Sequence, residues 1–180
     1  MLTACSSLII AVCDPSLNDL ALTRAAVRKA MDAFSIKCRS IARAYPTPEA
    51  LLAARPCDIC VTELELGTMD GFTLADAVRK RRPGAEVIFT TRCTDNAVVL
   101  RAWQANIAQY FLKPIETERD FTELRRVLGK LVNILIARPS PADGEGADDT
   151  LPPMTPALAY IGEVPGEMPG KGRSRNGRTS

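Results

Sequence analysis

Residues 56–72 have the sequence PCDICVTELELGTMDGF, and this stretch decides the fold. Its first half is a short run of apolar, small and β-branched residues, which is typical of a strand buried on both faces. The run ends at the acidic residue Glu63, and a loop containing Gly67 and Gly71 separates it from a helical pattern that begins near Phe72. Open α/β folds place their sites just beyond the carboxyl ends of their strands, so Glu63 marks the expected site.

Strand-like and helix-like segments alternate along the rest of the chain. Apolar runs at 8–13, 36–44, 86–91 and 108–112 predict four further strands. Helical periodicity and capping residues predict helices at 17–34, 48–55, 72–82, 95–106 and 118–138, with Asn106 in a left-handed conformation at one helix end. Five strands alternating with five helices predict an α/β fold with a doubly wound parallel sheet. The flavodoxin-like strand order 2-1-3-4-5 is expected.

The composition changes after Arg138. Residues 139–180 contain seven Pro and seven Gly, and their six acids exceed their four bases. Such a segment buries too little apolar surface to offset the entropy of ordering it, so we predict a disordered tail at 139–180 after a domain at 6–138. Within the tail, residues 154–161 have some apolar content and form a candidate docking peptide.

Composition excludes several classes of protein. The net charge is only +2, and no apolar run approaches the ~20 residues that span a bilayer, so no membrane association is expected and the predicted location is cytoplasmic. The six cysteines are expected to be free thiols in a reducing compartment. Cys57 and Cys60 form a single C-x-x-C, and the chain has no histidine to complete a zinc site.

Four predicted strands deliver polar side chains to one edge of the sheet. Asp14, Glu63, Thr91 and Lys113 each stand at the carboxyl end of a strand, and Pro114 follows the lysine. The carboxyl ends of parallel strands share an edge, so these four side chains are expected to meet there.

This order of groups resembles that of the response-regulator receiver domains of two-component signalling. The resemblance covers about residues 6–138, and the stretch YFLKPI at 110–115 is most similar to LytTR-type receivers. The residues of the opening stretch that fit the family pattern are Asp58, Ile59, Val61, Glu65, Met69, Asp70, Gly71 and Phe72.

The resemblance implies roles for the acidic residues. Glu63 occupies the position of the phosphoacceptor aspartate. In the family, that aspartate, an acidic pair after the first strand and a backbone carbonyl hold Mg²⁺. Here the corresponding groups are Asp14 and the carbonyl of Glu65.

The resemblance also implies roles for three residues at the ends of the last two strands. The Thr91 hydroxyl and the Lys113 ammonium correspond to the groups that bind the phosphoryl group. Tyr110 corresponds to the aromatic residue whose rearrangement accompanies switching.

The chain departs from the family pattern in three places. Cys13 leaves Asp14 as a single acid, so Mg²⁺ binding is expected to be weak and no cofactor is firmly predicted. Glu63 is longer than aspartate by one methylene, about 1.5 Å, in a reaction that tolerates little misplacement. Arg92 stands where the family has a small residue, and it is expected to cover the pocket mouth or to pair with Glu63.

These departures favour an atypical receiver, or pseudo-response regulator, that acts through protein–protein interaction. Glu63 is expected to accept hydrogen bonds from Lys113, and from Arg92 or Thr91, in place of a phosphoryl group. Two alternatives stay open: an inert scaffold, in which Glu63 forms a buried ion pair and nothing switches, and residual phosphorylation by a sensor histidine kinase.

The resemblance implies a protein partner, either a second copy or another protein, because receivers often pair through the face that corresponds here to helix 95–106, strand 108–112 and helix 118–138. Trp103 and the surplus apolar residues Val127, Ile134 and Ile136 indicate that face. No DNA-binding domain is expected in this chain, so a truncated LytTR-type regulator is a further alternative. A cofactor enzyme of flavodoxin type would need a glycine-rich loop after the first strand, and residues 13–16 contain no glycine.

Overall fold

The computed structural model describes residues 7–32, 34 and 40–137. Its sheet consists of β1 (Leu8–Cys13), β2 (Ser40–Tyr45), β3 (Ile59–Thr62), β4 (Glu86–Thr91) and β5 (Gln109–Leu112). All paired neighbours run parallel, in the order β2-β1-β3-β4-β5. The predicted α/β class and strand order are therefore confirmed.

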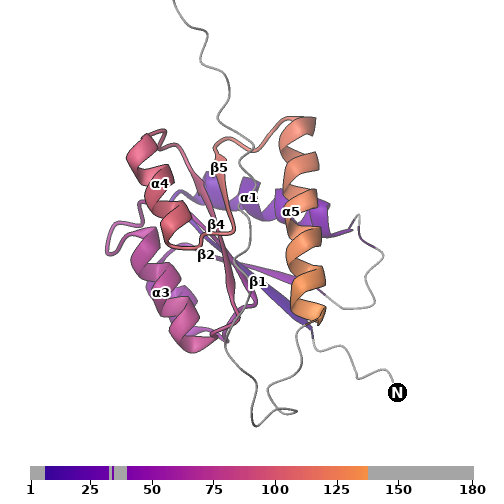
Figure 1. Cartoon of the computed structure of the whole chain (residues 1–180), viewed down its shortest axis with the longest axis horizontal. Helices are drawn as coiled ribbons and strands as arrows, with labels where there is room; N and C mark the ends of the chain where they lie inside the picture. Colours follow the sequence, from indigo (N-terminus) through magenta and orange to yellow (C-terminus); the bar gives the residue numbers. More distant parts are fainter. Residues whose placement is uncertain (1–6, 33, 35–39, 138–180) are drawn as a thin grey trace, which may run out of the picture.

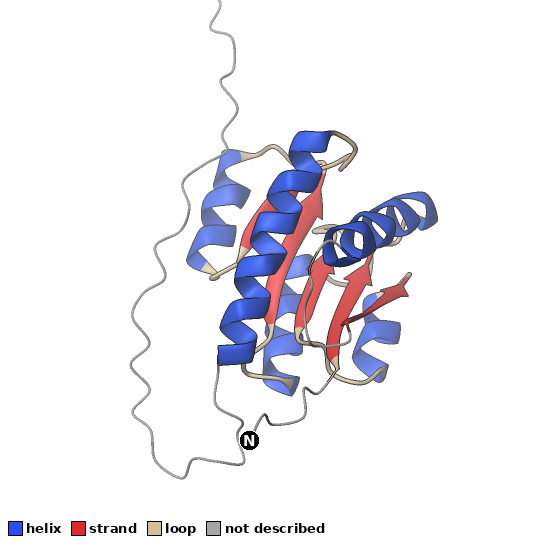
Figure 2. Cartoon of the chain, turned by 90° about the vertical axis from the view of Figure 1, so that its right-hand side faces the viewer, coloured by secondary structure: helices blue, strands red, loops and turns tan. Residues whose placement is uncertain are grey.

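Five helices connect the strands. They are α1 (Leu17–Asp32), α2 (Pro48–Ala53), α3 (Gly71–Arg81), α4 (Asn96–Gln104) and α5 (Glu118–Ala137). Figure 1 shows α1 and α5 on one side of the sheet and α3 and α4 on the other, and Figure 2 shows the strands enclosed between these layers. None of the helices in the described ranges combines the length and the apolar character needed to cross a bilayer.

The sheet separates two apolar cores. In β1, Leu8, Ile10 and Val12 pack in the core that contains the buried residues of α1 and α5. The alternate residues Ile9, Ala11 and Cys13 pack in the core beneath α2, α3 and α4. This alternation buries both faces of β1 and explains why its sequence is continuously apolar.

Capping residues in the sequence set the ends of α3 and α4. Asp70 caps α3 by accepting a hydrogen bond of 2.7 Å from the backbone N–H of Thr73, and Asp95 caps α4 through the N–H of Ala97 at 2.8 Å. Asn106 has a φ of 52° after α4, which confirms the predicted left-handed residue. These boundaries fix the loops that carry the site.

One residue that the sequence placed on the surface lies in the core. Val127 is 6% exposed and belongs to the core between α1 and α5, so its prediction as a surplus surface residue was wrong. The α5 stripe is wide because this helix packs against both α1 and the sheet. The first four residues of the predicted strand at 36–44, both domain boundaries and the tail at 139–180 lie outside the described residues.

Candidate functional site

Lys113 is the centre of a buried ionic cluster at the carboxyl edge of the sheet. Its ammonium donates to Oε2 of Glu63 at 2.5 Å and also to Oδ2 of Asp14. The side chains of Lys113 and Asp14 are only 3% and 2% exposed. The ends of β1, β3 and β5 therefore bring together three of the four polar side chains that the sequence placed at this edge.

Backbone contacts hold Glu63 in position. Its N–H donates to the carbonyl of Cys13 at 2.9 Å, which extends the β1–β3 pairing by one step. The other carboxylate oxygen, Oε1, accepts a hydrogen bond of 2.7 Å from the N–H of Leu64. Both oxygens of Glu63 thus have an internal donor, which satisfies a charge that would be costly to bury alone.

A third carboxylate, which the sequence analysis missed, belongs to the same cluster. Asp19 lies in the first turn of α1, and its Oδ2 is 3.4 Å from the ammonium of Lys113. The Ser16 hydroxyl accepts from the N–H of Asp19 at 3.3 Å, and Asp14 accepts from the N–H of Ser16 at 2.9 Å. Side chains in the first turn of a helix point back towards its N-terminus, and that direction would have indicated Asp19.

Arg92 pairs with Asp19, so the expectation that it would pair with Glu63 was wrong. Its guanidinium donates to both carboxylate oxygens of Asp19, at 2.7 and 3.3 Å. The arginine is 61% exposed and the aspartate 12%, so the guanidinium lies over the rim of the pocket from the solvent side. The pair links the loop after β4 to the start of α1.

Thr91 and Tyr110 both contact the loop between β4 and α4. The buried Thr91 hydroxyl accepts a hydrogen bond of 3.3 Å from the N–H of Cys93. The Tyr110 hydroxyl donates to the Cys93 carbonyl at 2.7 Å, and the Tyr110 ring packs edge-on against Phe89. Burial raises the pKa of Tyr110, so the phenol stays a hydrogen-bond donor.

Negative charge dominates the cluster. Burial raises the pKa of Asp14, and its bonds to Lys113 and Ser16 offset this only in part. Burial alone would lower the pKa of Lys113, but the bonds to Asp14 and Glu63 outweigh it and raise the pKa. Both groups therefore hold their protons to a higher pH than usual, the acid because it is buried and the base because of its carboxylate partners.

The side chains present do not fit the magnesium ion that the resemblance implies. Both carboxylate oxygens of Asp14 and both of Glu63 already accept hydrogen bonds from internal donors. Glu65, whose carbonyl was the third candidate ligand, lies in the loop after β3 and forms an isolated bridge with Asp70. Among the described residues, no group of three acidic or thiol side chains could hold a metal ion. The ammonium of Lys113 and the guanidinium of Arg92 supply positive charge at this site.

Comparison with known families identifies this domain. Residues 17–125 match the response regulator receiver domain model. The chain belongs to the response regulator receiver domain family. The predicted receiver identity is thereby confirmed, while the LytTR subtype and the role of Glu63 stay predictions. Receiver domains are signalling domains of two-component systems.

Two curated proteins and many solved structures are similar to part of this chain. The chain is 34% identical over 96 residues to the transcriptional regulatory protein RprY of Bacteroides fragilis, covering 49% of this chain and 41% of RprY. It is 22% identical over 112 residues to the DNA-binding transcriptional regulator NtrC of Proteus hauseri, covering 62% of this chain and 24% of NtrC. It therefore spans less than half the length of these curated relatives. A CheY-like receiver domain protein from Methanospirillum hungatei JF-1 has the same fold, with a TM-score of 0.55, 19% identity, and coverage of 71% of this chain and 96% of that one.

Proposed function

We propose that this receiver domain signals with its pocket held in one arrangement by Glu63, without a phosphoryl group or Mg²⁺. The observation that carries the proposal is the 2.5 Å hydrogen bond from Lys113 to Oε2 of Glu63. The resemblance assigns Lys113 to the phosphoryl group. In this chain a carboxylate oxygen that belongs to the protein already accepts from its ammonium.

The geometry of Glu63 argues against its use as a nucleophile. One oxygen is bound to Lys113 and the other to the N–H of Leu64, so attack on a phosphodonor would first break a charge-assisted bond. The added methylene displaces the carboxylate by about one C–C bond, or ~1.5 Å, and a misplacement of that order costs on the order of a hundredfold in rate.

Arg92 completes the proposed arrangement. Its bidentate pair with Asp19 joins the loop after β4 to α1. In the same loop, the Cys93 carbonyl accepts a hydrogen bond from the Tyr110 hydroxyl. A planar guanidinium suits a bidentate carboxylate contact, which fixes direction as well as distance. In our proposal this pair and the Glu63–Lys113 bond together hold the loop that links the pocket to α4 and β5.

The output surface of this proposal is the face formed by α4, β5 and α5. Its exposed large apolar side chains are Leu100, Trp103, Leu112 and Ile136, each more than half exposed. Exposed apolar side chains on neighbouring elements favour protein–protein contact, so we propose a second copy or another protein as the partner. A cytoplasmic location stays a prediction.

Intact-mass measurement after incubation with a small phosphodonor and Mg²⁺ tests the chemistry. The natural chain should gain no phosphoryl group. The double variant Cys13→Asp/Glu63→Asp, which restores the family's acids, should gain one, and Glu63→Asp alone should gain less. A phosphoryl adduct on the natural chain that is lost in Glu63→Ala would overturn the proposal.

Hydrogen exchange separates a fixed signalling state from an inert scaffold. Glu63→Gln keeps the shape of the side chain but weakens its bond to Lys113. A fixed state predicts faster amide exchange in the loop 91–96, α4 and β5 in this variant. A scaffold predicts that only amides next to residue 63 change.

The names of the relatives favour a second function. RprY and NtrC are both described as transcriptional regulators. A role in transcription would require DNA binding through a segment other than the described domain. A salt-dependent mobility-shift assay with the full chain tests this alternative, and binding that persists near physiological salt would support it.

A further inference from the structure

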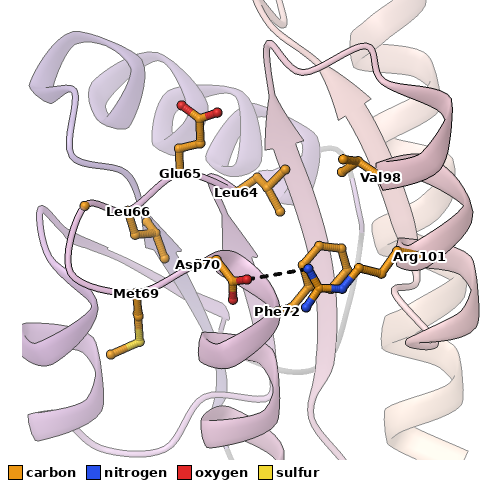
Figure 3. Close-up of a pocket in the computed structure, with 9 residues that line it drawn as sticks. Leu64, Glu65, Leu66, Met69, Asp70, Phe72, Val98 and Arg101 are labelled. Carbon is orange, nitrogen blue, oxygen red and sulfur yellow. Dashed lines mark ion pairs between the residues drawn. The ribbon is translucent and has the colours of Figure 1, made fainter.

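A groove on the receiver surface lies between the loop after β3 and α4, outside the ionic cluster but next to it at Leu64. Its volume is about 550 Å³, and Figure 3 shows the side chains that line it. Its apolar lining residues are Leu64, Leu66, Met69, Phe72 and Val98. Three charged residues also line the groove: the acids Glu65 and Asp70 and the cation Arg101.

Arg101 forms one wall of this groove and contacts both Phe72 and Asp70. Its guanidinium carbon lies 3.9 Å from the centre of the Phe72 ring, and the guanidinium is 3.7 Å from the Asp70 carboxylate (Figure 3). A stacked and paired arginine presents the hydrophobic face of its guanidinium, which suits contact with apolar and aromatic side chains. The groove therefore fits a short apolar peptide rather than a charged one.

We propose that residues 154–161 of the same chain, MTPALAYI, dock in this groove. This segment lies outside the described residues, and it falls within 150–162, the longest stretch of residues 139–180 that has no charged residue. Leu158, Tyr160 and Ile161 supply the side chains that match an apolar groove edged by an arginine.

The connecting chain is long enough for this contact. α5 ends at Ala137, which leaves 16 residues before Met154. An extended chain of that length spans up to ~55 Å. A domain of this size is roughly 35 Å across, by the scaling of globular domains. Tethering of this kind gives effective concentrations of roughly millimolar, so even weak contacts are populated.

Charge complementarity fixes the direction of the proposed path. Four acids and no base lie in residues 139–153, and they are Asp143, Glu145, Asp148 and Asp149. The last turn of α3 carries Arg79, Lys80 and Arg81. Arg79 donates to the backbone carbonyls of Ala105 and Asn106, and Arg81 donates to that of Ala54. Because these acceptors are neutral, the positive charge of both arginines remains available to anions.

The order of these features along the tail matches their order along α3. Figure 1 shows α3 and α5 ending at the same edge of the molecule, where the basic turn lies. The groove lies at the opposite end of α3, which has 11 residues and is thus ~16 Å long. A tail that leaves α5 meets the basic turn with its acids first and reaches the groove with its apolar segment next.

Docking of this segment would restrict access to the partner face. The groove includes Val98 and Arg101 of α4, and the exposed residues Leu100 and Trp103 belong to the same helix. It also includes Leu64, whose N–H holds the Glu63 carboxylate. A docked tail would therefore compete with partners for α4 and stabilise the loop that positions Glu63.

Photo-cross-linking of the full chain tests the proposal. With p-benzoylphenylalanine in place of Leu158, we expect cross-links within one chain to peptides 64–72 or 96–101, and a lower yield at high salt because the acidic segment is then screened. The same probe in place of Met168 is the matched control. Cross-links between chains, cross-links to other regions, or equal yields from both positions would overturn the proposal.

Hydrogen exchange gives an independent test, with variants whose substitutions all lie outside the described domain. Leu158→Asp/Tyr160→Asp should speed exchange of amides in 64–72 and 96–101 by about tenfold, which corresponds to ~1.4 kcal/mol of docking free energy. Val164→Asp/Met168→Asp, which adds the same charge further along, should leave these rates unchanged. Equal rates in all three chains would contradict docking.

Discussion

The ammonium of Lys113 and the carboxylate of Glu63, 50 positions apart in the chain, are joined by a hydrogen bond of 2.5 Å. The carboxyl ends of β3 and β5 lie at the same edge of the sheet, with β4 between them, and this places the two side chains within reach. Lys113 also contacts Asp14 and Asp19, so one cation holds three acids from three segments of the chain. The stability of the pocket should therefore depend on this residue more than on any one acid.

Lys113→Met should lower the free energy of unfolding by about 3–5 kcal/mol, because it leaves buried carboxylates without their partner. Urea denaturation measures the change. Lys29→Met is the control, since Lys29 forms an exposed ion pair with Glu118 at 3.5 Å and should cost under about 1 kcal/mol. Equal costs for the two variants would contradict a central role for Lys113.

The pH dependence of stability should reveal the burial of Asp14. Folding raises the pKa of Asp14 above its usual value of 3.8. At a pH between 3.8 and the raised pKa, the folded state keeps a proton that the unfolded state has released. The stability of the natural chain relative to Asp14→Asn should therefore fall as the pH rises above about 4, and level off once Asp14 has lost its proton in the folded chain as well. Denaturation at a series of pH values checks this, and a relative stability that rises over that range would contradict it.

The Arg92–Asp19 pair should couple the β4–α4 loop to α1. In a double-mutant cycle with Arg92→Ala and Asp19→Asn, we expect a coupling free energy of up to about 1 kcal/mol, because the arginine is largely exposed. Each single variant should also speed amide exchange in residues 92–96. Additive effects on stability together with unchanged exchange would show that the pair does not hold the loop.

Gly71 permits a close approach that positions Glu63. A Cβ at this residue would lie 2.8 Å from the carbonyl oxygen of Glu63 and 3.2 Å from the Phe89 ring. Gly71→Ala should therefore cost about 1–3 kcal/mol, the usual range for overpacking. The control is Gly67→Ala, where the φ of 83° strains the backbone but nothing lies within 4 Å, so it should leave the Glu63–Lys113 contact unchanged. Thermal unfolding and the amide NMR signals of residues 63 and 64 distinguish the two effects.

Much of the fold could be predicted from the sequence because strands and helices alternate with clear periods. β1 and β4 have the predicted limits, since each is a short apolar run closed by polar residues at its carboxyl end. Asp14, Glu63 and Lys113 were predicted to meet because the carboxyl ends of parallel strands share an edge.

Side chains on helices were harder to predict. Asp19 was missed and Arg92 was assigned the wrong partner because strand order does not specify how the first turn of α1 is rotated over that edge. Val127 was wrongly placed on the surface, since the periodicity of α5 does not show that α1 packs against it. In each case the missing information was the packing of one helix against another element.

Amide NMR spectra of the full chain, recorded before and after adding Mg²⁺ and a small phosphodonor, test the central claim most directly. If the Glu63 carboxylate already takes the place of the phosphoryl group beside Lys113, the amide signals of residues 63–66, 91–96 and 109–113 should not shift. The Cys13→Asp/Glu63→Asp variant should show movement in the same residues. Shifts of these signals in the natural chain, centred on Glu63 and propagated to Tyr110, would show that the pocket still switches and would contradict the account.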